Sequence, residues 1–125
     1  MSAANRSVFW FRRGLPFLVA FAVSGSALGA APDKKTERLW KSKCASCHGA
    51  DGKGDTEQGK KMKVSNIATP GWQKSHTDDQ IRDAILNGVK TEKDGVKKEM
   101  DPYKDELSPD QVKALVDFIR ALPTS

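Results

Sequence analysis

The chain has two cysteines, Cys44 and Cys47, which stand three residues apart, and His48 follows the second directly. If this stretch is helical, the three residues occupy positions i, i+3 and i+4 and share one face. Two thiols and one imidazole are then presented together to a single binding partner. Any fold proposed for the 125 residues must accommodate this arrangement.

The C-x-x-C-H spacing is typical of haem c attachment, in which two thiols reach the two vinyl groups of one porphyrin and the imidazole reaches its iron. The alternative interpretations are a structural disulfide, a redox-active dithiol and half of a zinc site. A thioredoxin-like dithiol favours a βαβ setting, which the sequence pattern does not show. Zinc requires four ligands, and His76 is the chain's other histidine. The motif therefore predicts one covalent haem c, held by Cys44 and Cys47, with His48 as an iron ligand.

The first 31 residues have the order of a secretory signal peptide. Three arginines precede an apolar run at residues 15–23, and small residues follow up to Ala31. The apolar run is too short to span a bilayer, and Pro16 lies inside it. We therefore expect residues 1–31 to be cleaved in a bacterial periplasm, leaving one domain at 32–125 without a membrane anchor.

The formal charge of +5 falls to +2 once the three leader arginines are removed, and two haem propionates would bring it close to zero. Nucleic-acid binding therefore loses its support. The remaining charge is uneven, because residues 33–98 carry 15 basic and 10 acidic side chains, whereas residues 99–125 carry 3 and 6. Such a field can orient docking on a redox partner, and the alternative is an ordinary solvated surface.

The stretch after Asp33 predicts a first helix that delivers the attachment motif at its end. Asp33 can cap this helix, and Leu39 and Trp40 form an apolar stripe with the motif residues. Three glycines within residues 49–54 then end the helix and allow a tight loop. Residues 55–75 contain few large apolar side chains, so we expect a buried porphyrin to complete the core.

Two capping boxes predict two further helices. Residues 77–80 open a middle helix that ends at residues 87–88. Residues 108–111 open a final helix, in which apolar side chains recur at helical spacing up to Leu122. Residues 89–99 are rich in lysine and have no stable period, so we expect a mobile loop there. The pattern predicts no strand, and the fold class is all-α.

Five features follow one another along the chain: CASCHG, ADGKGD, a capped middle helix, a methionine ahead of a proline and an aromatic residue, and the final helix in LSPDQVKALVDFIRAL. Together they resemble a small bacterial class I cytochrome c over nearly all of residues 32–125. The resemblance implies a cytochrome c fold, in which the N- and C-terminal helices cross around one covalently bound haem. It also implies that Trp40 packs near Leu115, Phe118 or Ile119.

The function that this resemblance implies is electron transfer by iron that cycles between two oxidation states. No catalysed reaction is implied, and the partners are membrane or periplasmic oxidoreductases that dock on a monomer. His48 would be the proximal iron ligand, with its second ring nitrogen donating to a backbone carbonyl. Family members often take that carbonyl from a proline in the following loop, where this chain has Ser65 in the nearest register.

Four options exist for the sixth iron ligand: Met62, Met100, His76 or none. Met62 lies 14 residues past His48, too close to reach the opposite face after the glycine loop. His76 stands at the start of the middle helix, where a surface histidine is the ordinary outcome. Met100 lies 52 residues past His48 and is the predicted ligand, although Asp101 replaces the usual following proline. An open sixth position would instead indicate a peroxidase-like or gas-sensing protein.

Overall fold

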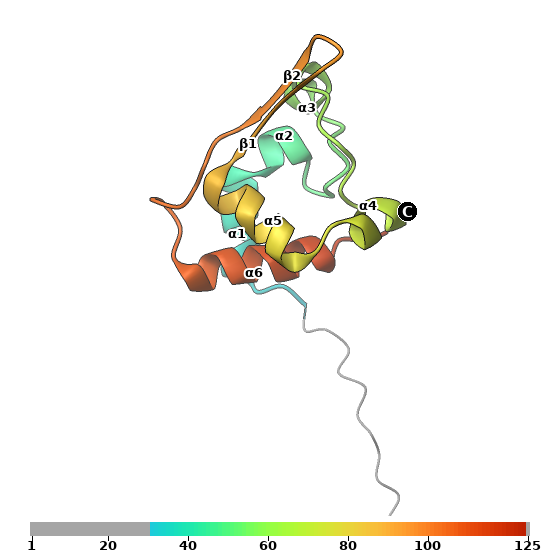
Figure 1. Cartoon of the computed structure of the whole chain (residues 1–125). Helices are drawn as coiled ribbons and strands as arrows, with labels where there is room; N and C mark the ends of the chain where they lie inside the picture. Colours follow the sequence, from blue (N-terminus) through green and yellow to red (C-terminus); the bar gives the residue numbers. More distant parts are fainter. Residues whose placement is uncertain (1–30, 125) are drawn as a thin grey trace, which may run out of the picture.

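The computed structural model describes residues 31–124, so the predicted signal peptide lies outside them except for its last residue. Within this range, no helix has the length and apolar character needed to cross a membrane. The elements follow in this order (Figure 1): α1 (Lys34–Lys43), α2 (Ala45–His48), α3 (Glu57–Lys61), α4 (Pro70–Ser75), α5 (Asp78–Asn87), β1 (Val89–Lys93), β2 (Val96–Met100) and α6 (Pro109–Arg120).

The predicted first helix is divided into α1 and α2 by a bend at Cys44. The Asp33 carboxylate caps α1 as predicted, because it accepts the Thr36 backbone N–H at 2.8 Å. At Cys44 the backbone takes φ −119° and ψ −38°, and α2 continues as a separate single turn. The attachment motif therefore begins at the bend rather than within one continuous helix.

The helices α5 and α6 begin at the two predicted capping boxes. The side chains of Thr77 and Ser108 each accept the backbone N–H of the third residue of their helix, which is a glutamine. The glutamine side chain in turn accepts the backbone N–H of the threonine or serine. Gly88, with φ 74°, ends α5, and α6 ends at Arg120. Both capped helices are thus confirmed where the sequence predicts them.

The core lies between α6 and the helices α1 and α5, which both contact it (Figure 1). Trp40 of α1 packs against Phe118 of α6 with ring centroids 5.1 Å apart, as the resemblance implies. Burying a valine or leucine side chain contributes about 1.5–3 kcal/mol, so each apolar side chain buried at this contact stabilises the fold. The buried apolar side chains form one cluster: Trp40, Ile67, Ala68, Ile81, Ile85, Leu107, Val112, Leu115, Val116, Phe118, Ile119 and Leu122.

The segment between α3 and α5 contributes little to this core, as its composition predicts. Ile67 and Ala68 are buried, whereas Trp72 is half-buried. The short helices α3 and α4 were not predicted by periodicity, because each is too short to show it. Their first turns are capped by Thr56 and Thr69, respectively.

Residues 89–100 form an antiparallel hairpin, so the predicted mobile loop is wrong. The two strands pair with Val89 opposite Met100. Asp94 and Gly95 join them with φ values of 54° and 74°, as in the two-residue type I′ turns that Asp-Gly favours. The strictly all-α prediction is therefore corrected to a helical fold with one small sheet.

Candidate haem-attachment site

The three motif side chains lie on one helical turn. The backbone N–H groups of Cys47 and His48 both donate to the carbonyl oxygen of Cys44, at 3.3 and 3.0 Å. The side chains of all three residues are half-buried. The structure thus brings together the two thiols and the imidazole that the spacing predicts.

Trp40 supports this turn from the side of α1. Its indole N–H donates to the carbonyl oxygen of Gly49 at 3.0 Å, and its ring centroid lies 5.9 Å from that of His48. The side chain is only 2% exposed. The same residue therefore joins the core between α1 and α6 to the end of the attachment turn.

The loop after the turn requires glycine at the positions where the sequence has it. Gly49, Gly52 and Gly54 have φ values of 79°, 74° and 70°, which non-glycine residues rarely adopt. A Cβ on Gly52 would lie 2.5 Å from a methyl group of Leu122, so the loop passes close to the end of α6. The Gly54 N–H donates a hydrogen bond to the His48 carbonyl oxygen at 2.7 Å. The predicted tight glycine loop is confirmed.

The His48 side chain is half-buried, but its Nδ1 atom is fully buried and has no hydrogen-bond partner among residues 31–124. Burial also lowers the pKa of His48, which favours the neutral ring that binds metals. Leaving Nδ1 unpaired costs about 1–3 kcal/mol, and a metal bound at the other ring nitrogen, Nε2, would not remove that cost. What suits His48 to a haem iron is a neutral ring on the same turn as the two thiols. Within the described residues, Nδ1 makes no hydrogen bond to the backbone carbonyl that the resemblance implies near Ser65.

The two thiols suit covalent attachment better than redox exchange. Both cysteines are free and half-buried. Burial raises the pKa of the Cys44 thiol to about 11, whereas a redox-active dithiol needs a lowered thiol pKa. No group of three or more metal-ligating His, Cys, Asp or Glu side chains occurs in the described part of the chain, which counts against the zinc interpretation. The donor set of two thiols and one neutral imidazole therefore fits haem c.

Met100 is the last residue of β2 and is half-buried against the core cluster. Its carbonyl oxygen lies so close to Gly88 that a Cβ there would overlap it. Just beyond, the Tyr103 N–H donates to the Ile85 carbonyl at 3.0 Å, which ties the chain to α5. Met100 is therefore placed by the base of a hairpin and not by a mobile loop.

The other two side chains considered for the sixth position have local partners. The sulfur of Met62 accepts from the Gln58 side chain at 3.2 Å. The His76 ring stacks on Trp72 with centroids 4.2 Å apart, and its Nδ1 lies 3.0 Å from the Trp72 carbonyl oxygen. These contacts favour the interpretation of His76 as a surface histidine.

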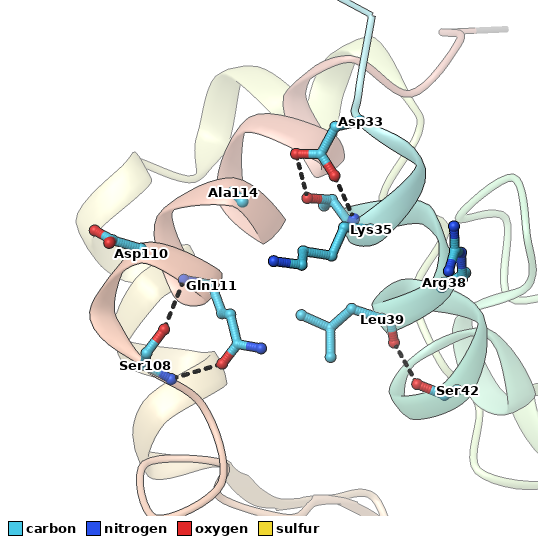
Figure 2. Close-up of a pocket in the computed structure, with 10 residues that line it drawn as sticks. Asp33, Lys35, Arg38, Leu39, Ser42, Ser108, Asp110, Gln111 and Ala114 are labelled. Carbon is cyan, nitrogen blue, oxygen red and sulfur yellow. Dashed lines mark hydrogen bonds between the residues drawn. The ribbon is translucent and has the colours of Figure 1, made fainter.

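A groove of about 830 Å³ lies elsewhere, between α1 and the first turns of α6 (Figure 2). Lys35 and Leu39 of α1 face Gln111 of α6 across it. None of the three motif residues lines this groove. It is therefore separate from the attachment turn.

Comparisons with known proteins show the family of the chain. Residues 34–123 match the family model of cytochrome c. Among solved structures, the KustC0563 c-type cytochrome is 30% identical with a TM-score of 0.60, over 71% of this chain and 98% of that one. A mutant of the same cytochrome is 31% identical with a TM-score of 0.58, over 70% and 96% of the two chains. A search of curated proteins found no significant match. The chain therefore belongs to the cytochrome c family, whose cofactor is covalently attached haem c.

Proposed function

We propose that the protein is a periplasmic monohaem electron carrier, in which His48 and Met100 bind the iron of a haem attached at Cys44 and Cys47. Membership of the cytochrome c family carries haem-based electron transfer with it. The observation that supports the residue assignment best is that Cys44, Cys47 and His48 lie on one helical turn, where burial lowers the pKa of His48 and favours its neutral ring.

The haem supplies the one-electron chemistry, because its iron is stable in two oxidation states. The chain contributes binding and tuning. The thiols of Cys44 and Cys47 would attach the porphyrin, and the neutral imidazole of His48 would bind its iron. Trp40 packs beside the His48 ring with centroids 5.9 Å apart, and Phe118 packs against Trp40, so the core supports the imidazole.

Met100 is the proposed sixth ligand because the hairpin base gives it a fixed place next to the core. A soft thioether favours ferrous iron, so it raises the reduction potential compared with a second histidine. Members of the family are generally electron carriers rather than enzymes. The alternative, a haem with an open sixth position, is decided by the experiment below.

Location and partners are part of the same proposal. The signal-peptide pattern of residues 1–31 supports export to the periplasm. The excess of basic side chains in residues 33–98 supports docking on an acidic face of another redox protein. We expect the mature protein to act as a monomer.

The test is visible spectroscopy and redox titration of the protein after signal cleavage and haem attachment. We expect a reversible one-electron couple and, in the oxidised form, the weak methionine-to-iron charge-transfer band at the red end of the visible spectrum. The reduced form should resist carbon monoxide. Rapid binding of carbon monoxide together with loss of the band would support the open-site alternative and contradict the proposed carrier.

A further inference from the structure

We propose that Thr56 is a positioning residue for the haem, because its hydroxyl holds the peptide bond that precedes His48. The inference rests on the proposed role of His48 as an iron ligand. Thr56 lies eight residues beyond His48, in the loop that leads into α3, and nothing in its local sequence indicates a role at the iron.

The contacts of the Thr56 hydroxyl reach back to α2. Its oxygen lies 2.8 Å from the carbonyl oxygen of Ser46 and 3.2 Å from that of Cys47, so its proton is shared between them. The same oxygen accepts the Gly59 N–H at 2.8 Å, which caps α3. One side chain thus acts at once as a helix cap and as a donor to the attachment turn.

These two carbonyls need a donor because they lie in the last turn of α2. The last carbonyl groups of a helix have no partner within it. Gly49 ends α2 with φ 79°, and its own N–H bonds to the Ala45 carbonyl at 2.8 Å. The next residues turn away, so Thr56 supplies the donor that the helix lacks.

The backbone of His48 is consequently held on both sides. The Cys47 carbonyl belongs to the peptide bond before His48, and Thr56 holds it. The His48 carbonyl belongs to the peptide bond after it, and the Gly54 N–H holds that one at 2.7 Å. Together these two contacts fix the direction in which the side chain leaves the backbone.

This backbone support matters because the Nδ1 atom of the ring has no hydrogen-bond partner within residues 31–124 to orient it. A metal-bound histidine is usually oriented by a partner on its second nitrogen. Here Nδ1 has no such partner in the part of the chain that the structure describes. The orientation of the imidazole then depends on the backbone contacts and on packing against Trp40.

Gly59 allows α3 to approach closely enough for Thr56 to act. A Cβ on Gly59 would overlap the carbonyl oxygens of Cys47 and Gly54. It would also lie 2.9 Å from the Thr56 hydroxyl oxygen. The backbone of α3 therefore rests directly on the attachment turn, with the hydroxyl at the point of contact.

The experiment compares oxidised holo-protein variants by proton NMR of the haem methyl groups. Their hyperfine shifts depend on the orientation of the axial ligands, which a merely structural change elsewhere does not alter. Thr56→Val removes the hydroxyl, and Thr56→Ser keeps it. The matched control is Thr77→Val, because Thr77 caps α5 through the Gln80 N–H at 3.2 Å without touching the attachment turn.

We expect Thr56→Val to change the spread or order of the haem methyl shifts and Thr56→Ser to keep the wild-type pattern. Thr77→Val should lower the melting temperature to a similar extent and leave the pattern unchanged. If Thr56→Val lowers the melting temperature but keeps the wild-type pattern, Thr56 is only a helix cap and the inference fails.

A second variant covers the case in which Thr56→Val yields no folded protein. Thr56→Asp keeps an acceptor for the Gly59 N–H but has no proton to donate to the two carbonyls at neutral pH. Altered haem methyl shifts in this variant support the inference, and a wild-type pattern overturns it. A wild-type spectrum without histidine ligation would instead contradict the proposed function, so the two failures are distinguishable.

Discussion

The indole N–H of Trp40 donates to the carbonyl oxygen of Gly49 at 3.0 Å, across the end of the turn that carries His48. The Trp40 ring also packs against Phe118 of α6. One buried side chain therefore links the main helix contact of the fold to the haem-binding turn. Loss of the indole N–H should therefore lower the free energy of unfolding even if the core packing is kept.

We expect Trp40→Phe to lower the free energy of unfolding by about 1–3 kcal/mol, because it leaves a buried carbonyl short of a donor. The Gly52 N–H, at 3.3 Å from the same oxygen, compensates only in part. Trp40→Ala should cost about 3–5 kcal/mol through the cavity it creates. Guanidinium unfolding of the holo-protein measures both values.

The control for this prediction is Trp72→Phe. Trp72 is half-buried, and its indole N–H makes no hydrogen bond within residues 31–124. Its replacement should therefore cost less than that of Trp40. Equal losses for the two variants would show that the Gly49 contact adds nothing to ring packing.

Gly59→Ala provides a prediction in which two effects oppose each other. Helix propensity favours alanine over glycine by about 1 kcal/mol, so propensity alone predicts a gain in stability. The Cβ would however overlap two carbonyl oxygens in the attachment turn, which are backbone atoms and cannot rotate away. We therefore expect a lower melting temperature and reduced yield of holo-protein.

Gly71 is the matched control for Gly59, because it lies in α4 and a Cβ there would meet nothing within 4 Å. Gly71→Ala should raise stability by about 0.5–1 kcal/mol, as expected for an unhindered helix position. Thermal melting monitored by circular dichroism compares the two. A gain for both variants would mean that α3 does not press on the attachment turn.

The helix starts, the apolar stripe of the last helix and the attachment motif could be predicted because each sequence pattern lies within a few neighbouring residues. Capping boxes at Thr77 and Ser108 and the stripe of α6 depend on residues within one or two helical turns. The C-x-x-C-H spacing is equally local. Each of these features lies where the sequence predicts it.

The hairpin was missed although its turn signal, Asp94-Gly95, is present in the sequence. Lysines on both strands obscured the alternation, because neither face of the hairpin is a continuous apolar surface. Pairing instead relies on the backbone and on cross-strand contacts such as the ion pair of Lys90 and Glu99 at 3.1 Å. Such pairs contribute only about 0.2–1 kcal/mol each, and they leave little trace in hydrophobic periodicity.

The contacts of Thr56 with the attachment turn could not be predicted for a different reason. Thr56 is one of the residue types that often cap helices, but the sequence does not reveal that its hydroxyl also reaches carbonyls nine and ten residues earlier. That contact depends on the close approach of α3 to α2, which only the three-dimensional structure shows. The burial of the His48 Nδ1 atom without a hydrogen-bond partner in the described residues likewise depends on the three-dimensional structure.

Covalent attachment should be visible on a denaturing gel. With Cys44 and Cys47 intact, peroxidase staining should show haem that migrates with the chain. Cys44→Ala combined with Cys47→Ala should abolish the stain, because no thiol remains to form a thioether. Haem that extracts from the wild-type protein into acidified organic solvent would contradict attachment through the two thiols.

Folding should depend on the haem, because residues 55–75 add only Ile67 and Ala68 to the buried apolar cluster. A domain of this size buries a limited share of its surface, so the loss of a buried porphyrin weakens a core that is already small. We expect the double cysteine variant to lose much of its helical far-ultraviolet circular dichroism. A cooperative thermal transition with full helix content in that variant would show that the polypeptide folds without its cofactor.

Substitution of the proposed sixth ligand decides between an electron carrier and an open haem. Met100→Ala should abolish the red charge-transfer band of the oxidised protein and allow the reduced protein to bind carbon monoxide. The reduction potential should also fall, because a thioether stabilises ferrous iron. The packing loss should cost less than the value of about 2–5 kcal/mol expected for a fully buried methionine, since Met100 is only half-buried.

The controls for this substitution are Met62→Ala and His76→Ala, which should keep both the band and the resistance to carbon monoxide. Met62 lies at the end of α3, where its sulfur accepts from Gln58, and His76 stacks on Trp72. Neither side chain is held at the hairpin base. Loss of the band in one of these variants, with Met100→Ala unchanged, would move the sixth ligand to that residue.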